Sequence, residues 1–299
     1  PRRFERSLAR GWWITSFSAL ASRGGSAGDE QPDHDAEPGA ALAAAGEGIF
    51  AFPRGGRPGR CLHSIYQHWD FTSDDEQALA QLCTRMLKRY GFDPGWTEVV
   101  ADNVRRVLAT PLDGRGLRLR DVGRGRRLDE LEFHYPVRAL EPAALGRLLR
   151  AHGFLGEVAV KERIGRLQFG YGRSFMKGYI DLVCEHDGRY YLIDYKSNWL
   201  GPTQADYGLT QVAEAMAARD YHLQYLIYTV ALHRYLGARL PDYDYEHHFG
   251  GVYYLFLRGM DPEQGSRSGV FHDRPSRALI EGLDRYLRTG LVGEVSDVV

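Results

Sequence analysis

The stretch KGYIDLVCEHDGRYYLIDYKSNWLG, residues 177–201, contains two short apolar segments that each carry one aspartate. Asp181 stands inside GYIDLV, and Asp194 stands inside YYLIDYKS, two residues before Lys196. A charge in a buried strand is costly unless it is paired or binds a metal. These two acids therefore require an explanation, and they decide how the rest of the chain is interpreted.

The two aspartates are predicted to lie close together in one sheet. The dipeptide Asp187-Gly188 between the segments is a strong tight-turn signal, so the segments should form an antiparallel hairpin. Side chains alternate along a strand, which puts Lys196 on the same face as Asp194. Magnesium prefers oxygen ligands such as carboxylates and phosphate, and an ammonium can stabilise an attacking hydroxide. The pattern indicates phosphodiester hydrolysis, and an ordinary ion pair is the alternative for either acid taken alone.

The remaining pattern predicts an α/β or α+β fold, a mixed sheet flanked by helices with a helix-rich N-terminal part. Helical spacing begins near residue 60 and continues over about 75–90 and 95–108. LEFHYPV at 131–137 alternates like a strand, and a helix follows it. After the hairpin we expect helices at about 207–219 and 221–237, a strand GGVYYLFLRG, a Gly/Ser-rich turn and a final helix at about 275–288.

Composition excludes several classes of protein. The chain has 299 residues, 43% hydrophobic and 26% charged, with a formal net charge of -1, which suits one large or two smaller globular domains. Because the net charge is near zero, a nucleic acid would have to bind to a locally positive surface patch. Three cysteines without a CxxC pair argue against a disulfide framework or zinc site and fit a cytoplasmic location. No apolar run approaches the roughly 20 residues of a membrane span, and no GxxxxGK-type motif offers an ATP site.

Longer motifs resemble a known family. GYIDLV, DYKSNWLG, LQYLIYTVALHRYL and YDYEHHFGGVYYLFLRG are similar to the C-terminal nuclease domain of RecB, a subunit of the RecBCD helicase-nuclease, also called exodeoxyribonuclease V. The resemblance covers most of the chain, from about residue 52 to the final helix. It implies the PD-(D/E)XK nuclease fold, in which Asp181 matches the first acid and Asp194-Tyr195-Lys196 matches the (D/E)XK triple.

The resemblance implies a metal site and a catalytic group. Asp181, Asp194, His63 in GRCLHS and the backbone carbonyl of Tyr195 would be metal ligands, and Lys196 would act on the nucleophile. Taken alone, His63 would be an ordinary surface or packed histidine. The metal is expected to be Mg²⁺, and Mn²⁺ should also be accepted because of the imidazole ligand.

Three further residues are implied by the same resemblance. Glu130 matches an additional catalytic acid, and Glu132 on the same strand face is its competitor. Gln224 and Tyr228, four apart on one helix face, match a Q-x-x-x-Y motif that positions the DNA strand being cut. Amphipathic packing is the alternative for this pair.

The implied function is Mg²⁺-dependent cleavage of DNA, at single-stranded and double-stranded ends, in double-strand-break repair, recombination and foreign DNA degradation. The implied partners are the RecC and RecD subunits and the recombinase RecA. One alternative is a catalytically silent nuclease-like module that docks RecA or partner subunits. Another is a sequence-specific restriction endonuclease of the same fold.

We expect three parts: a lead-in segment at 1–22, a flexible loop or tether at 23–48, and the nuclease domain at 49–299. Within the domain, a helical part spans about 57–110 and the catalytic core about 128–290. The tether is rich in Gly, Ala, Pro and acids and has no hydrophobic period. Because the chain begins at Pro1 rather than Met, we expect a piece of a longer polypeptide that carries the motor.

Two other signals have competing interpretations. The segment at 242–248 holds several acids and histidines, and it could be a metal cluster or could serve structure or partner contact. The arginine-rich run at 115–127 could contact DNA phosphates or be a solvated loop.

Limited proteolysis tests the tether. Cleavage by a protease of broad specificity should start within residues 23–48, because a polar segment without a hydrophobic period presents exposed backbone. Mass spectrometry of the early fragments identifies the cut sites. Protection of this segment while other loops are cut would contradict the prediction.

Overall fold

The computed structural model describes residues 12–15, 45–114, 116–138, 141–154, 164 and 173–292. The chain divides into two compact units, one formed by residues 1–30, 133–178 and 276–299, the other by residues 31–132 and 179–275. Most of the expected lead-in at 1–22 and of the tether at 23–48 lies outside the described residues. The expected boundaries therefore stay predictions.

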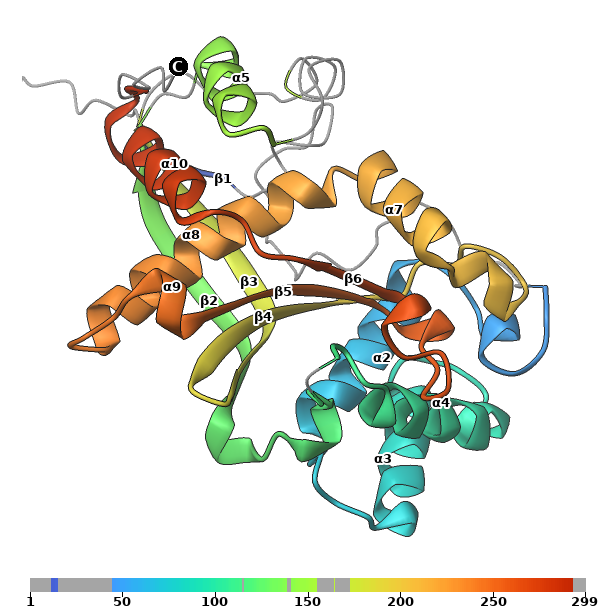
Figure 1. The fold of residues 1–299 in the computed structure, drawn as a ribbon. Coiled ribbons are helices and arrows are strands. Elements are labelled where there is room, and N and C mark those ends of the chain that lie inside the picture. Colours follow the sequence, from blue (N-terminus) through green and yellow to red (C-terminus); the bar gives the residue numbers. More distant parts are fainter. Residues whose placement is uncertain are drawn as a thin grey trace, which may run out of the picture. The chain divides into compact units, whose positions relative to one another are not determined.

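The sheet of the second unit is built on the predicted hairpin (Figure 1). Strand β3 (Arg173–His186) pairs antiparallel with β4 (Arg189–Lys196), from Leu182 opposite Ile193 to His186 opposite Arg189. The two turn residues, Asp187 and Gly188, have φ values of 50° and 74°, as the tight hairpin turn requires. The hairpin prediction is confirmed.

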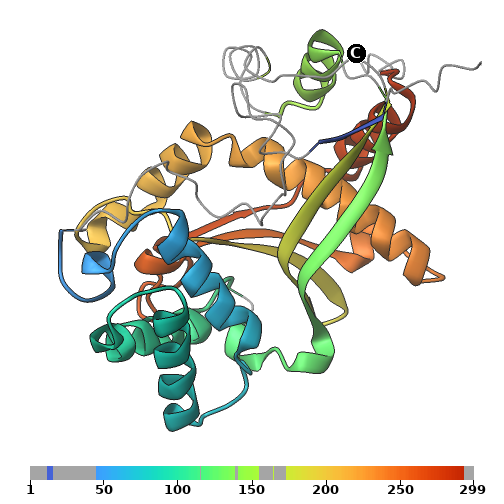
Figure 2. The ribbon, with the colours of Figure 1, turned by 180° about the vertical axis from the view of Figure 1, so that it is seen from behind.

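Further strands make this sheet mixed. β5 (Phe249–Phe256) runs parallel to β4, and β6 (Val270–Asp273) pairs antiparallel with β5. On the other side, β2 (Arg127–Val137) pairs with β3 (Figure 2). The expected mixed sheet flanked by helices is confirmed. The short strand β6 falls within the region that the sequence predicts as a turn, because four residues show too little alternation to be recognised.

Helices of the second unit cover both faces of the sheet (Figure 1). On one face, α2 (Gly56–His68), α3 (Glu76–Arg89) and α4 (Thr97–Ala109) form one apolar core with strand residues that include Ile193 and Tyr195. On the other face lies α8 (Tyr221–Arg239). Two more helices are α7 (Leu209–Ala218) and α9 (Tyr245–His248). The helices predicted near 60, 75–90, 95–108, 207–219 and 221–237 are all present.

Short 3-10 helices connect these elements. They are Gly48–Ala51, Pro94–Trp96, Leu119–Asp121, Arg124–Arg126, Gln204–Tyr207, Leu257–Gly259 and Gly265–Arg267. The predicted strand GGVYYLFLRG therefore ends earlier than expected, at Phe256. This early end places Arg258 in a turn beside the sheet.

Arg258 ties the segment before α2 to the end of β4. Its side chain is buried, and it donates hydrogen bonds to the carbonyl oxygens of Ile49, Phe52, Pro53 and Ser197 at 2.7–3.0 Å. A buried guanidinium is tolerated only when its donors are satisfied. Because Ser197 directly follows β4, this clamp fixes where α2 begins relative to the strand.

Among its described residues, the first unit has the helices α5 (Pro142–Ala151) and α10 (Arg277–Thr289), as the sequence predicts. The Tyr286 hydroxyl donates to the Glu141 carbonyl at 2.8 Å and accepts from the Glu141 amide at 2.7 Å. Strand β1 (Trp12–Thr15) pairs in parallel with the first residues of β3. In the part of the chain that the structure describes, no helix is long and apolar enough to cross a membrane.

Replacement of Arg258 by Met should destabilise the second unit. The change removes the charged donor from four carbonyl oxygens, so we expect the free energy of unfolding to fall by about 3 kcal/mol. Urea unfolding followed by tryptophan fluorescence measures the loss. Arg106→Met is the control, because Arg106 forms a half-exposed ion pair with Asp261 that should contribute about 1 kcal/mol or less. Equal losses for the two variants would contradict the clamp.

Candidate active site

Strand β4 carries a buried ion pair. Lys196 Nζ lies 2.8 Å from Asp194 Oδ1, and the two side chains are 1% and 5% exposed. Alternation puts both on the face of the sheet toward α8. The ion pair expected as the alternative for an isolated acid is thus present, and it lies within a larger group of charged side chains.

Asp181 joins β4 to helix α2. It lies one residue beyond Leu182, the last paired residue of β3 on this side. Its Oδ2 accepts a hydrogen bond from the backbone N–H of Tyr195 at 2.8 Å, and its Oδ1 lies 3.4 Å from His63 Nδ1. One carboxylate therefore contacts both the (D/E)XK segment and the histidine on the early helix.

The ring of Tyr195 holds α2 in place on the opposite face from Lys196. It stacks on Tyr66 with ring centroids 4.8 Å apart and meets His63 edge to face at 5.7 Å. His63 is buried, with 6% of its surface exposed. Alternation along β4 thus lets Tyr195 pack against α2, while its neighbours Asp194 and Lys196 lie on the other face, where they form an ion pair.

Electrostatic repulsion links the carboxylates. Burial raises the pKa of Asp194 to about 7; the Lys196 ammonium opposes this shift and the charge of Asp181 adds to it. Burial also raises the pKa of Glu130, and Asp181 again adds to the shift while His63 opposes it. Asp181 therefore repels both Asp194 and Glu130, and a bound divalent cation would relieve this repulsion.

Glu130 and Glu132 lie on β2 in different environments. Glu130 has a φ of 48°, in the left-handed region, and its pKa responds to Asp181 and His63. Glu132 accepts a hydrogen bond from the Tyr179 hydroxyl at 2.9 Å. A non-glycine residue with this φ is strained, and such strain often occurs at functional sites. The geometry favours Glu130 over its competitor, and its catalytic role stays a prediction.

Gln224 and Tyr228 of α8 are buried beside the ion pair. Gln224 Oε1 accepts hydrogen bonds from Lys196 Nζ at 3.2 Å and from the Tyr254 hydroxyl at 2.9 Å. Gln224 Nε2 donates to the Tyr228 hydroxyl at 3.3 Å. Gln224 thus links Lys196 to Tyr228, and the role of Gln224 and Tyr228 in positioning DNA stays a prediction.

Sequence reasoning missed two aromatic residues at this site. The Lys196 Nζ lies 3.9 Å from the ring centroid of Tyr221 and 5.1 Å from that of Tyr254. Tyr221 precedes Gln224 by three residues on α8, and Tyr254 is the register partner of Asp194 on β5. Helical spacing could have suggested Tyr221, whereas Tyr254 required knowledge of the parallel register.

The donor types fit a divalent metal, but their placement is not a ligand set. Asp181, Asp194, His63 and the Tyr195 carbonyl would supply oxygen and imidazole donors, which suit Mg²⁺ and Mn²⁺. Within the described ranges, no three His, Cys, Asp or Glu side chains are arranged to hold an ion. The reason is visible in the contacts, since Asp194 Oδ1 bonds Lys196 and Asp181 Oδ2 bonds a backbone amide.

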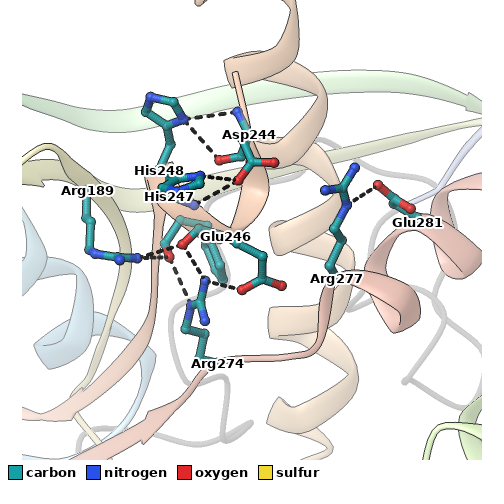
Figure 3. Close-up of polar contacts among 9 residues, drawn as sticks. Arg189, Asp244, Glu246, His247, His248, Arg274, Arg277 and Glu281 are labelled. Atoms are coloured by element: carbon teal, nitrogen blue, oxygen red, sulfur yellow. Dashed lines mark hydrogen bonds and ion pairs between the residues drawn. The ribbon is translucent and has the colours of Figure 1, made fainter. Parts of the chain in front are cut away.

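The segment at 242–248 serves local packing, as the structural interpretation predicted. It forms the short helix α9, where Asp244 accepts from the backbone N–H of His247 at 3.0 Å. Glu246 pairs with Arg274 at 2.8 Å, and Arg189 donates to the Glu246 carbonyl (Figure 3). These contacts occupy Asp244, His247 and Glu246, three of the groups that made a metal cluster conceivable.

The arginine-rich run at 115–127 divides into buried and exposed members. Arg127 is buried, donates to the Trp69 carbonyl at 2.6 Å and pairs with Asp129 at 3.2 Å, so it is structural. Other arginines of the run are exposed, namely Arg120, Arg124 and Arg126. Contact of these three with DNA phosphates stays a prediction.

Comparisons with known proteins agree with the motifs. Residues 43–292 match the family model of the PD-(D/E)XK nuclease superfamily. The chain is 40% identical over 278 residues to the RecBCD enzyme subunit RecB of Escherichia coli (strain K12), which covers 91% of this chain and 23% of that protein. It is 34% identical to RecB of Haemophilus influenzae over 94% of this chain and 24% of that protein.

RecB of Mycobacterium tuberculosis (strain ATCC 25618 / H37Rv) is 34% identical over 97% of this chain and 30% of that protein. The chain thus spans about a quarter of the length of these relatives. The fold and the resemblance to RecB that the motifs indicate are confirmed.

Substitutions at Glu130 test the backbone strain on β2. Glycine adopts a positive φ without strain, so Glu130→Gly should leave the free energy of unfolding within about 1 kcal/mol of the parent. Glu130→Val should lower it by about 2 kcal/mol or more, because a β-branched residue disfavours this φ. Urea unfolding measures both variants, and Glu132→Val is the control at a position without positive φ. Similar losses for the two valine variants would contradict the strain.

Proposed function

Because the chain belongs to the PD-(D/E)XK nuclease superfamily, we propose that it is the DNA-cleaving domain of a RecBCD-type helicase-nuclease. The observation that supports this proposal is a pair of contacts, Asp194 with Lys196 and Asp181 with His63, linked by the hydrogen bond from the Tyr195 amide to Asp181. Two acids, a lysine on the same strand face and an imidazole supply the groups that metal-assisted phosphodiester hydrolysis needs.

Asp181, Asp194, His63 and the backbone carbonyl of Tyr195 would hold Mg²⁺, with Mn²⁺ accepted through the imidazole. Bound there, the cation would lower the pKa of a water molecule and polarise a phosphoryl oxygen. The carboxylates would turn toward it from their contacts with Lys196 and the Tyr195 amide. The repulsion of Asp181 with Asp194 and with Glu130 supports this site, because a cation bound there would offset it.

Lys196 would stabilise the negative charge that develops on the nucleophile and the phosphate during in-line attack. Its ammonium is already oriented by Asp194 and by Gln224. Glu130 would accept a proton or orient the attacking water, which its raised pKa suits. Gln224 and Tyr228 would position the DNA strand being cut, and Gln224 would do so partly through its hydrogen bond to Lys196. No covalent enzyme intermediate is required.

The substrates would be single-stranded and double-stranded DNA ends, and the process double-strand-break repair, recombination and foreign DNA degradation. The relatives are named as RecB subunits of RecBCD enzymes, which supports RecC and RecD as partners of the intact polypeptide. RecA is the further partner that we propose. A cytoplasmic location is supported by three free, buried cysteines.

DNA cleavage with and without metal tests the function. The chain should cut a labelled single-stranded oligonucleotide with Mg²⁺ or Mn²⁺ but not with EDTA. Asp181→Ala and Asp194→Ala should each reduce the rate by about 10³-fold or more, because each removes a charged metal ligand.

Asp242→Ala is the matched control, since Asp242 is an exposed acid outside the site. Its rate should equal that of the parent chain, and circular dichroism should show the same fold in all variants. Parent-like cutting by Asp194→Ala would contradict the site. Absence of cutting by folded parent chain, also within an assembled complex with RecC and RecD, would favour the silent docking module.

A further inference from the structure

We propose that Tyr221 and Tyr254 are positioning residues that hold the ammonium of Lys196 beside Asp194 through their ring faces. This inference rests on the proposed nuclease function, in which Lys196 acts on the reacting groups. It adds two aromatic residues from two different elements, helix α8 and strand β5, to the site.

The distances support a cation–π arrangement. Lys196 Nζ lies 3.9 Å from the ring centroid of Tyr221 and 5.1 Å from that of Tyr254, both within the roughly 6 Å at which a ring attracts a cation. The lysine side chain is 1% exposed. Because water does not screen the charge at this position, the attraction belongs to the stronger end of its range.

Both rings are themselves fixed. The Tyr221 hydroxyl donates to Asn198 Oδ1 at 3.2 Å, and the Tyr254 hydroxyl donates to Gln224 Oε1 at 2.9 Å. The two ring centroids lie 5.7 Å apart. A ring held at its hydroxyl end presents a defined face, so the charge that it attracts also has a defined position.

The ring faces supply what the ion pair cannot. A lysine has a flexible four-carbon stem, and a single carboxylate leaves the ammonium free to swing about it. Gln224 Oε1 adds a second directional contact at 3.2 Å. Aromatic faces attract the ammonium charge without accepting a directional N–H hydrogen bond. They can therefore restrict where the ammonium lies while its N–H groups stay directed at Asp194 and Gln224. Displacement of a catalytic group by about 1 Å can cost a large part of the rate.

Kinetics of two substitutions at Tyr221 test the role of the ring. With Mg²⁺ and a labelled single-stranded oligonucleotide, Tyr221→Leu should lower kcat by about 10-fold or more and change KM by less than about twofold. Tyr221→Phe keeps the ring and should restore kcat to within about threefold of the parent. If the ring only filled space, both variants would lose kcat only as far as they lost stability, and Tyr221→Phe would not restore kcat selectively.

Tyr245→Leu is the matched control. Tyr245 is also a buried helical tyrosine whose ring lies near a cation, with Arg274 Cζ 5.9 Å from its centroid, but it belongs to α9. This variant should lose stability and keep kcat. If Tyr221→Leu retained kcat, fell no further than Tyr245→Leu, or was not rescued by Tyr221→Phe, the inference would be wrong.

A second measurement does not depend on activity. Urea unfolding of Tyr221→Leu, Lys196→Met and the double variant measures their coupling. The midpoint of the double variant should fall by less than the sum of the two single shifts, whereas Tyr245→Leu with Lys196→Met should be additive. Additivity at Tyr221 would overturn the ring contact. A parent chain that cuts no DNA, also within the assembled complex with RecC and RecD, would refute the proposed function instead. The coupling measurement would then test the ring contact on its own.

Discussion

The burial of an ion pair in the middle strand of the sheet is the constraint on which the site depends. Asp194 and Lys196 are almost fully withdrawn from water on β4. A buried pair contributes little net stability, because desolvation offsets most of the attraction. An apolar pair of similar volume would serve the fold at least as well. In the proposed function, the fold bears this cost because the pair takes part in catalysis. The amide of Gln224 and two aromatic rings reduce the cost.

Alternation along β4 lets one strand serve two purposes. Asp194 and Lys196 face α8, and Tyr195 between them faces α2, where its ring meets Tyr66 and His63. A slip of one residue in the β3–β4 register would turn Tyr195 toward α8 and Asp194 and Lys196 toward α2, so the wrong side chains would be buried on each face of the sheet. The tight turn at Asp187-Gly188 fixes that register, so a local turn controls the composition of the site.

Long-range hydrogen bonds then hold distant segments at this strand. Asp181 reaches the Tyr195 amide from β3, and Arg258 gathers the carbonyl groups that precede α2 onto Ser197. Glu130 takes a strained backbone conformation on β2 while its carboxyl group senses Asp181. Each contact uses groups that would be costly to bury alone, which favours one arrangement over alternatives.

The sequence by itself determined most of the elements, the hairpin, the family and the carboxylate–lysine motif, because each depends on local periodicity, turn chemistry or contiguous residues. Through the resemblance, the sequence also proposed Glu130 as an additional catalytic acid, with Glu132 as its competitor. Only the tertiary structure showed that these two lie in different environments, brought His63 to Asp181, and placed Tyr221 and Tyr254 around Lys196. It also revealed β6 and the clamp of Arg258. Those features arise where separate elements pack together, and no local pattern of residues encodes which side chains will meet there.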